Sequence, residues 1–268
     1  MGVELVQKFE SYLADDKIEW PEKDVATPLG VQTYEMGLDK INEFNGNNPK
    51  VLQEGLHTFL SGDSLPYALA GTAYMFLAAA AEKDGTYAQE GIDLAMSWLE
   101  RAHELEEDLS EINFIEAFVY LRSGELENAR LVIDYLFEQA PYYYHLHIAE
   151  AQYWYALGEL DQMEEWYKKA AELADNVPKR LRLYSQMAQA YQENKDLDTA
   201  LKYFQKAVYF NKENGRLWHQ IAVIYWNQGN LEECARANQK TLKFAPTAGA
   251  KKLNEALKKR IEAEKKRR

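Results

Sequence analysis

The decapeptide YLRSGELENA at residues 120–129 has a pattern that returns three more times along the chain. It opens with an aromatic residue, passes through Gly and a Leu between polar residues, and closes on a small residue. The other copies are WYALGELDQM at 154–163, YQENKDLDTA at 191–200 and YWNQGNLEEC at 225–234. Their opening aromatic residues follow one another at intervals of 34, 37 and 34 residues. A period of this length indicates a chain made of stacked copies of one small unit.

Each copy predicts a tight turn between two amphipathic helices. Around the third copy, apolar residues recur three and four positions apart, as expected for one face of a helix. These residues are Tyr184, Met187, Ala188 and Tyr191 before the turn, and Ala200, Phe204 and Ala207 after it. Gly124, Gly158 and Gly229 can adopt the left-handed conformation that such a turn needs, and Lys195 takes that place in the third copy. The two helices of a unit should therefore pack antiparallel, with their apolar faces together.

The period and these residues resemble the tetratricopeptide repeat. The match is fullest in the last unit, at Trp218, Ile221, Ala222, Tyr225, Gly229, Cys234, Asn238, Thr241 and Pro246. The resemblance implies an all-α fold, an α-solenoid of stacked antiparallel helix pairs with a C-terminal capping helix. It also implies a non-catalytic scaffold or adaptor that binds other proteins, for instance in complex assembly. The sequence departs from the family's pattern at Glu116 and Glu150, where Leu is expected, and at Met163 and Cys234, which replace Ala.

The repeats divide the chain into segments of different regularity. The four regular units are expected at 109–143, 144–180, 181–214 and 215–248. Residues 28–108 should form two degenerate helix pairs, with a break at 45–49 and Pro49 at the start of a helix. An N-terminal helix and its linker are expected at 1–27, and a basic capping helix and tail at 249–268.

Composition is that of a globular protein from a reducing compartment. The 268 residues are 47% hydrophobic and 28% charged, and they include one cysteine, which excludes an intrachain disulfide framework. The opening MGVELVQKFESYLADDK is acidic where a signal peptide is basic. The longest apolar run, at 67–81, is short for a membrane span. We therefore expect a cytoplasmic protein without membrane insertion.

Charge is distributed unevenly along the chain, whose net charge is −12. Residues 1–108 hold 21 acidic and 7 basic side chains, whereas residues 249–268 hold nine Lys or Arg and three Glu. This asymmetry favours salt-sensitive, head-to-tail self-association as one hypothesis. The alternative to protein binding is a nucleic-acid-associated helical-repeat protein that uses its basic tail. The tail cations that could make such contacts are Lys258, Lys259, Arg260, Lys265, Lys266, Arg267 and Arg268.

Catalytic and metal-binding patterns are missing from the sequence, so we expect no enzyme, no cofactor and no metal site. His145 and His147 stand two positions apart, on different sides of a helix, and are therefore poorly placed to share an ion. We interpret them as partly exposed imidazoles at a helix start. Cys234 falls at a packed small-residue position, which predicts a buried thiol rather than a reactive one.

Glu116 and Glu150 occupy a position at which the first helix of a pair should face the second. Two interpretations remain open. Their side chains could reach the edge of the fold or pair with a neighbouring Tyr hydroxyl. Alternatively, they could form a polar hole that receives a basic group of a partner.

Helical phase, at about 100° per residue, selects the residues that point away from the packed side of each first helix. In a tetratricopeptide array these helices form the concave face, where we expect an extended or helical segment of a partner. The candidate groove residues are Phe114, Phe118, Leu121, Arg122, Gln152, Tyr155, Arg182, Gln189, Gln192, His219 and Trp226. Phe118 and Trp226 are expected to dominate affinity, unless Trp226 is buried between repeats. The carboxylate clamp of chaperone-binding repeats is not expected, because Phe, Ile, Gln and Ser replace its Lys and Asn.

Overall fold

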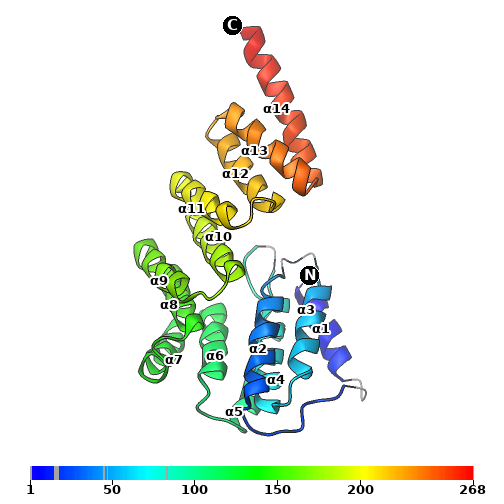
Figure 1. Ribbon diagram of the computed structural model, residues 1–268, viewed down its shortest axis with the longest axis vertical. Helices are drawn as coiled ribbons and strands as arrows, with labels where there is room; N and C mark the ends of the chain where they lie inside the picture. Colours follow the sequence, from blue (N-terminus) through cyan, green and yellow to red (C-terminus); the bar gives the residue numbers. More distant parts are fainter. Residues whose placement is uncertain (1, 15–17, 45, 47, 83, 268) are drawn as a thin grey trace. The chain divides into compact units, whose positions relative to one another are not determined.

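The computed structural model describes residues 2–14, 18–44, 46, 48–82 and 84–267, and this part of the chain is built of α-helices (Figure 1). Its β-structure is limited to two isolated bridges, between Lys23 and Ser64 and between Ala81 and Tyr87. The all-α fold predicted from the repeat period is confirmed. Backbone contacts divide the chain into two compact units, Met1–Ala156 and Leu157–Arg268.

Unit 1 contains eight of the described helices. They are α1 (Gly2–Leu13), α2 (Pro28–Ile41), α3 (Lys50–Leu60), α4 (Leu65–Ala79), α5 (Gln89–His103), α6 (Ser110–Ser123), α7 (Leu126–Gln139) and α8 (Tyr144–Ala156). The Thr27 hydroxyl caps the start of α2 by accepting from the Gly30 amide, and Pro28 follows in the first turn. Pro49 immediately precedes α3, as its N-cap, so the predicted helix start is confirmed.

Close approach of helices in unit 1 depends on small residues. The ring of Phe59 on α3 lies against Gly37 of α2 and Gly71 of α4. A Cβ atom added to Gly37 would lie 2.2 Å from that ring, and one added to Gly71 would lie 2.4 Å from it. Both separations are too short for non-bonded carbon atoms, which normally lie about 3.5–4.0 Å apart. The glycines are therefore required by packing, not by backbone conformation.

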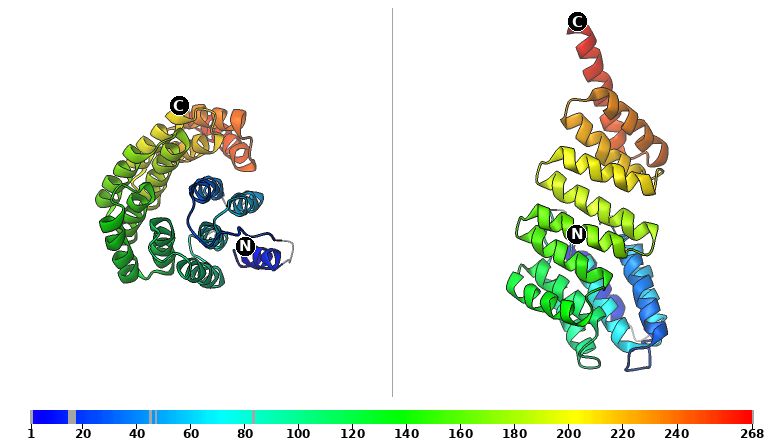
Figure 2. Two further views of the ribbon diagram at one scale, coloured as in Figure 1. Left: turned by 60° about the horizontal axis from the view of Figure 1, so that its bottom comes forward. Right: turned by 60° about the vertical axis from the view of Figure 1, so that its left-hand side comes forward.

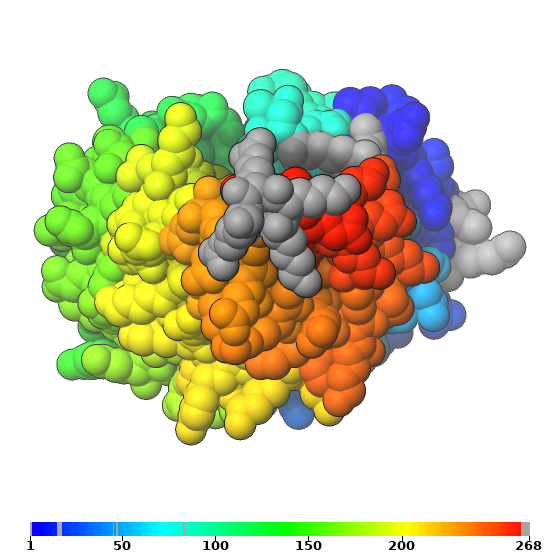
Figure 3. All heavy atoms as spheres, turned by 90° about the horizontal axis from the view of Figure 1, so that it is seen from above, coloured from blue at the N-terminus to red at the C-terminus, as the bar shows by residue number. Residues whose placement is uncertain are grey.

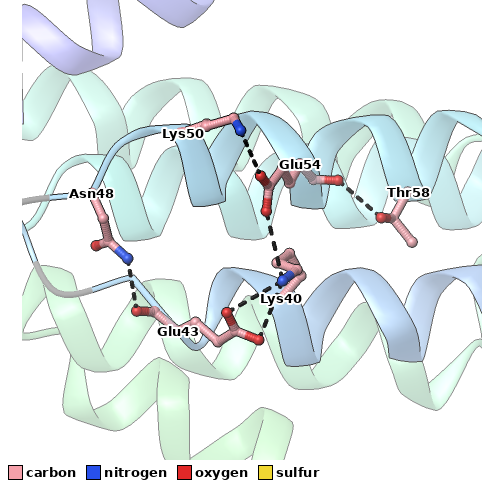
Figure 4. Close-up of polar contacts among 6 residues, drawn as sticks. All are labelled: Lys40, Glu43, Asn48, Lys50, Glu54 and Thr58. Carbon is pink, nitrogen blue, oxygen red and sulfur yellow. Dashed lines mark hydrogen bonds and ion pairs between the residues drawn. The ribbon is translucent and has the colours of Figure 1, made fainter. Parts of the chain in front are cut away.

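The exposed edge between α2 and α3 is held by polar contacts (Figure 4). The Lys40 ammonium lies 3.2 Å from the Glu43 carboxylate and 3.6 Å from that of Glu54, which also pairs with Lys50 at 3.5 Å. The Asn48 amide donates to the Glu43 carbonyl at 3.3 Å. Because these groups are open to water, each pair contributes about 0–1 kcal/mol, and the apolar seam beneath them carries most of the stability.

Unit 2 is a stack of antiparallel helices (Figure 2), in which the same type of tight turn precedes α9, α11 and α13. It contains α9 (Leu160–Leu173), α10 (Val177–Glu193), α11 (Leu197–Phe210), α12 (Gly215–Asn227), α13 (Leu231–Phe244) and α14 (Ala248–Arg267). Asn176, Asp196, Asn214 and Asn230 cap the starts of α10 to α13, each accepting from a backbone amide one turn into its helix.

The four predicted turns have the backbone conformation that the sequence required. The φ angles are +82° at Gly124, +81° at Gly158 and +76° at Gly229. Lys195 stands at +66°, and it is the one non-glycine residue with positive φ among those described. The repeated turn is therefore kept in the third copy although glycine is not.

The predicted capping helix is α14. Ala250 and Leu257 are buried, and the Asn238 side-chain amide of α13 donates to the Ala250 carbonyl at 3.1 Å. Figure 3 shows the atoms of α13 and α14, in orange and red, in contact at this end of unit 2. The helix thus covers apolar surface that the last repeat would otherwise expose.

Candidate functional site

The predicted groove residues lie on four helices, α6 and α8 of unit 1 and α10 and α12 of unit 2. We call the side of these helices that points away from the second helix of each pair the A-helix face. The two units differ in how far this face is open.

In unit 1, the aromatic residues that α6 contributes to the A-helix face are buried. Phe114 is 1% exposed and Phe118 is 6% exposed, and Leu121 is buried with them. The Tyr74 ring on α4 lies 6.1 Å from the Phe114 ring and 6.5 Å from the Phe118 ring, centroid to centroid. The expectation of an open aromatic face here is therefore wrong, because α4, from an earlier helix pair, packs across it.

The remaining predicted groove residues of unit 1 are also engaged within the fold. The Arg122 guanidinium donates to the side-chain oxygen of Gln152, which is buried. The same guanidinium lies over the Tyr87 ring at 5.2 Å and the Phe118 ring at 5.9 Å. Tyr155 is half-buried. These contacts stabilise unit 1 and leave little of its A-helix face for a partner.

A polar cluster joins α2 to the start of α8. Glu35 lies 3.4 Å from His145 Nε2 and accepts from the Tyr143 hydroxyl at 3.5 Å. The His145 ring stacks on Phe114 at 4.6 Å, and His147 Nε2 lies 3.0 Å from the Pro141 carbonyl. His145 and His147 are both buried, so the helix start was predicted correctly but the exposure was not.

Glu116 and Glu150 find their partners inside unit 1. Glu150 is 4% exposed and accepts 2.8 Å hydrogen bonds from Arg130 Nη1 and Trp154 Nε1. Glu116 lies 3.6 Å from His103 Nε2 and raises the pKa of that imidazole. These contacts agree with the intramolecular interpretation, although the partners of Glu150 are Arg and Trp rather than Tyr.

The A-helix face of unit 2 is polar and partly open. Gln189 is exposed, and Arg182, Gln192 and His219 are half-buried. Burial lowers the pKa of His219, which favours its neutral form near pH 7. Three of these residues, Arg182, Gln189 and Gln192, come from α10 alone.

Trp226 is half-buried because the capping helix reaches it. The Arg260 guanidinium of α14 lies over the Trp226 ring at 5.0 Å. Because α14 occupies the neighbouring surface, the Trp226 ring is only partly open, and its role as an anchor for a partner stays a prediction. A change at Trp226 should alter the attachment of α14 as well as any contact with a partner.

The basic tail is described only in part. Lys258, Lys259 and Arg260 are exposed on α14, and Arg260 is held at Trp226. The side chains of Lys265, Lys266 and Arg267, and the whole of Arg268, lie outside the described residues. Nothing observed for the described tail residues favours nucleic-acid binding.

Sequence reasoning missed a pocket on the other side of α12. This outer pocket, of about 590 Å³, is lined by Gln205 of α11, by Trp218, Ile221 and Tyr225 of α12, and by Glu233, Arg236, Ala237, Gln239, Lys240 and Lys243 of α13. The signal that could have found it is Ala237, because the third repeat has Tyr203 at the same repeat position.

Neither a metal-binding cluster nor a membrane-spanning helix is found in the described part of the chain. No group of three or more His, Cys, Asp or Glu residues there is arranged to hold a metal ion. No helix there combines the length and the apolar character that crossing a membrane requires.

Comparison with known proteins identifies two of the repeats. Residues 181–214 and 215–246 match the tetratricopeptide repeat model. The fold is similar to that of PilF from Pseudomonas aeruginosa, with 14% identity, a TM-score of 0.56, and coverage of 74% of this chain and 84% of that one. It is also similar to the Cut9–Hcn1 hetero-tetramer of the APC/C, with 14% identity, a TM-score of 0.55, and coverage of 95% of this chain and 46% of that one. No curated protein matches the sequence. At these identities the likeness concerns the fold.

Proposed function

We propose that this chain, a tetratricopeptide repeat protein, is a non-catalytic scaffold that holds a segment of a partner protein on the A-helix face of unit 2. The observation that carries the proposal is the accessibility of Gln189 and Gln192 on α10. The same repeat positions in unit 1 hold the buried residues Phe118 and Leu121. At these positions α10 of unit 2 therefore presents polar side chains to solvent, whereas α6 of unit 1 buries apolar ones within the fold.

The chemistry of α10 suits a peptide backbone. A Gln side chain offers both a carbonyl acceptor and an amide donor, so it can pair with a peptide group in either direction. Gln189 and Gln192 are three positions apart and lie on neighbouring turns of one helix face. Together they would bind an extended segment along α10.

The groups that could have carried catalysis are occupied or inert. Burial raises the pKa of the Cys234 thiol to about 11, so that thiolate is scarce at neutral pH. His145 contacts Glu35 and Phe114, and His103 contacts Glu116. Each imidazole therefore has a structural role, in agreement with a scaffold that acts by binding, as an adaptor in the assembly of a complex.

Site-specific crosslinking in the native host tests the proposal. A photo-crosslinking amino acid at position 189 identifies the contacting protein and the segment attached, and the same amino acid at exposed Glu172 of α9 is the matched control. We then expect Gln189→Ala with Gln192→Ala to weaken the purified segment's affinity by about tenfold or more. The melting temperature should stay unchanged.

An unchanged affinity of the double variant would contradict the proposal, as would equal crosslinking from positions 189 and 172. Deletion of residues 259–268 is the second arm. It should leave partner affinity within about threefold, because exposed tail charges contribute about 0–1 kcal/mol each.

A further inference from the structure

The outer pocket of the fourth repeat has a filled counterpart in the third. There, the Tyr203 ring of α11 is fully buried and lies parallel to two rings of α10. Its centroid is 6.2 Å from that of Tyr184 and 5.9 Å from that of Tyr191, with interplanar angles of 13° and 9°. In the third repeat, an aromatic side chain of α11 is thus inserted between two aromatic residues of α10 that are seven residues, or about two helical turns, apart.

Polar groups complete this arrangement in the third repeat. The Tyr191 hydroxyl donates to Glu164 Oε2 at 2.6 Å. Against the effect of its burial, hydrogen bonds from Lys168, Tyr191 and Tyr203 lower the pKa of Glu164 to about 2. Two ammonium groups lie near the Tyr203 ring, Lys206 at 5.0 Å and Lys202 at 5.2 Å from its centroid. An aromatic ring at this position is therefore stabilised by stacking and by cations.

In the fourth repeat the two flanking aromatic residues are present, but the inserted ring is not, and no carboxylate corresponding to Glu164 is bonded to Tyr225 among the described residues. Trp218 and Tyr225 stand at the repeat positions of Tyr184 and Tyr191, while Ala237 replaces Tyr203. The outer pocket, of about 590 Å³, lies where that ring would be, with the buried Ile221 among its lining residues. The Tyr225 hydroxyl at its rim accepts from the Gln205 amide at 3.3 Å.

The cations of the third repeat are also kept. Arg236 and Lys240 correspond to Lys202 and Lys206, and the Lys240 ammonium lies 3.6 Å from the Trp218 ring centroid. Lys243 adds a third cation to the lining, which has one carboxylate, that of Glu233. Arg236 is paired with Glu232 and Glu233, whereas no ion pair of Lys240 or Lys243 is found among the described residues. These two cations contact rings, Lys240 that of Trp218 and Lys243 that of Phe244 at 4.9 Å, and neither charge is neutralised by a carboxylate of the described residues.

We propose that the outer pocket binds an aromatic side chain of another protein, presented within an acidic segment. The aromatic ring would enter between Trp218 and Tyr225, as Tyr203 does in the third repeat. Carboxylates beside it would pair with Lys240 and Lys243. This surface lies on the other side of α12 from the A-helix face and is independent of the partner segment proposed for α10.

Labelled peptides test the pocket directly on the full-length protein. The probes carry a central Tyr, Phe or Trp flanked by three Asp on each side, and the matched control peptide has a central Ala. We expect fluorescence polarisation to show saturable binding of at least one aromatic probe and about tenfold weaker binding of the Ala peptide. Gln189→Ala with Gln192→Ala should not alter this binding, which separates it from the function proposed for α10.

The decisive variant is Ala237→Tyr, which copies the third repeat and should fill the pocket from within. We expect it to keep its helix content and to bind the aromatic probe at least tenfold more weakly. If it fails to fold, Lys240→Ala with Lys243→Ala replaces it, and that variant should weaken the acidic probe by about fivefold or more.

Four binding results would overturn the proposal, and so would a fifth result, on self-association. The four are equal binding of the aromatic and Ala peptides, unchanged binding by a folded Ala237→Tyr protein, loss of binding on deletion of residues 259–268, and no binding of any probe below about 1 mM. If Ala237→Tyr instead abolishes self-association in sedimentation, the occupant is a second copy of this chain and the proposal is wrong.

Discussion

The first and third repeats use the same helix position in opposite ways. Phe118 of α6 and Gln189 of α10 hold the same place in their repeats, yet Phe118 is buried and Gln189 is exposed. In the first repeat the burial comes from a helix of an earlier pair. In unit 1, α4 brings Tyr74 onto Phe114 and Phe118, so that a face available for binding in one repeat belongs to the core in another. A repeat position therefore has no fixed role without its neighbour.

Truncating the two matched residues should give the largest contrast. Phe118→Ala is expected to lower the free energy of unfolding by about 4 kcal/mol, because it removes a buried ring and leaves a cavity beside Tyr74. Gln189→Ala should change it by less than about 0.5 kcal/mol. Chemical denaturation of both variants measures the two values. Equal losses would show that the two faces are packed alike.

The second contrast concerns Glu150 and its counterpart in the third repeat, the buried Met187. Glu150→Ala removes the acceptor of the Trp154 indole and of the partly buried Arg130, and should cost about 2 kcal/mol because both donors lose a hydrogen bond. Replacing both members of the pair, with Glu150→Leu and Arg130→Met, should cost less than the single change. If the double variant is less stable than Glu150→Ala, apolar side chains cannot replace the ion pair at this position, and the comparison with the third repeat fails.

The turns offer a smaller, reciprocal pair of changes. Gly124→Ala forces a Cβ atom into a backbone of positive φ and should destabilise by about 1 kcal/mol. Lys195→Gly relieves the same strain in the third repeat, and the gain of up to about 1 kcal/mol is partly offset by the greater freedom of glycine in the unfolded chain. Thermal melting of the two variants should shift in opposite directions, and a shift in the same direction would contradict this account.

The smallest effect is a pH dependence restricted to unit 1. Glu116 raises the folded pKa of His103, so this pair stabilises the fold below the unfolded imidazole pKa of about 6.5. The contribution is lost as pH rises through the folded pKa. Since the pair is partly exposed, the contribution should stay below about 1 kcal/mol.

Glu116→Gln should lower the His103 pKa in an NMR titration and flatten the pH dependence of stability across this window. An unchanged pKa would mean that Glu116 does not act on the imidazole.

The helix pairs and their turns could be predicted because their signals are local. The 3.6-residue spacing and the residues that allow positive φ lie within one repeat, and the period only requires that successive copies be compared. The structure confirms the turns even at Lys195. The burial of Phe114 and Phe118 could not be predicted from phase alone. Helical phase predicts which side of α6 points away from α7, the second helix of its pair. It does not predict that Tyr74 of α4, from an earlier pair, packs on that side.

The same reasoning explains the other differences at the predicted groove. Trp226 is partly covered by Arg260 of α14, a contact that depends on how the capping helix docks rather than on the repeat pattern. The outer pocket, by contrast, could have been found from the sequence. Aligning the third and fourth repeats places Ala237 against Tyr203, and a small residue opposite a large one marks a space to be filled.

The buried Cys234 allows local opening of the fourth repeat to be measured by thiol labelling. It is the single cysteine of the sequence, and burial raises its pKa to about 11, so a thiol reagent meets a reactive group only when α13 opens. The labelling rate of the folded protein, divided by that of the denatured chain, then gives the opening equilibrium of this one repeat when reclosing is fast. Labelling followed by mass spectrometry would read local unfolding in a native sequence, without an engineered probe and separately from global denaturation.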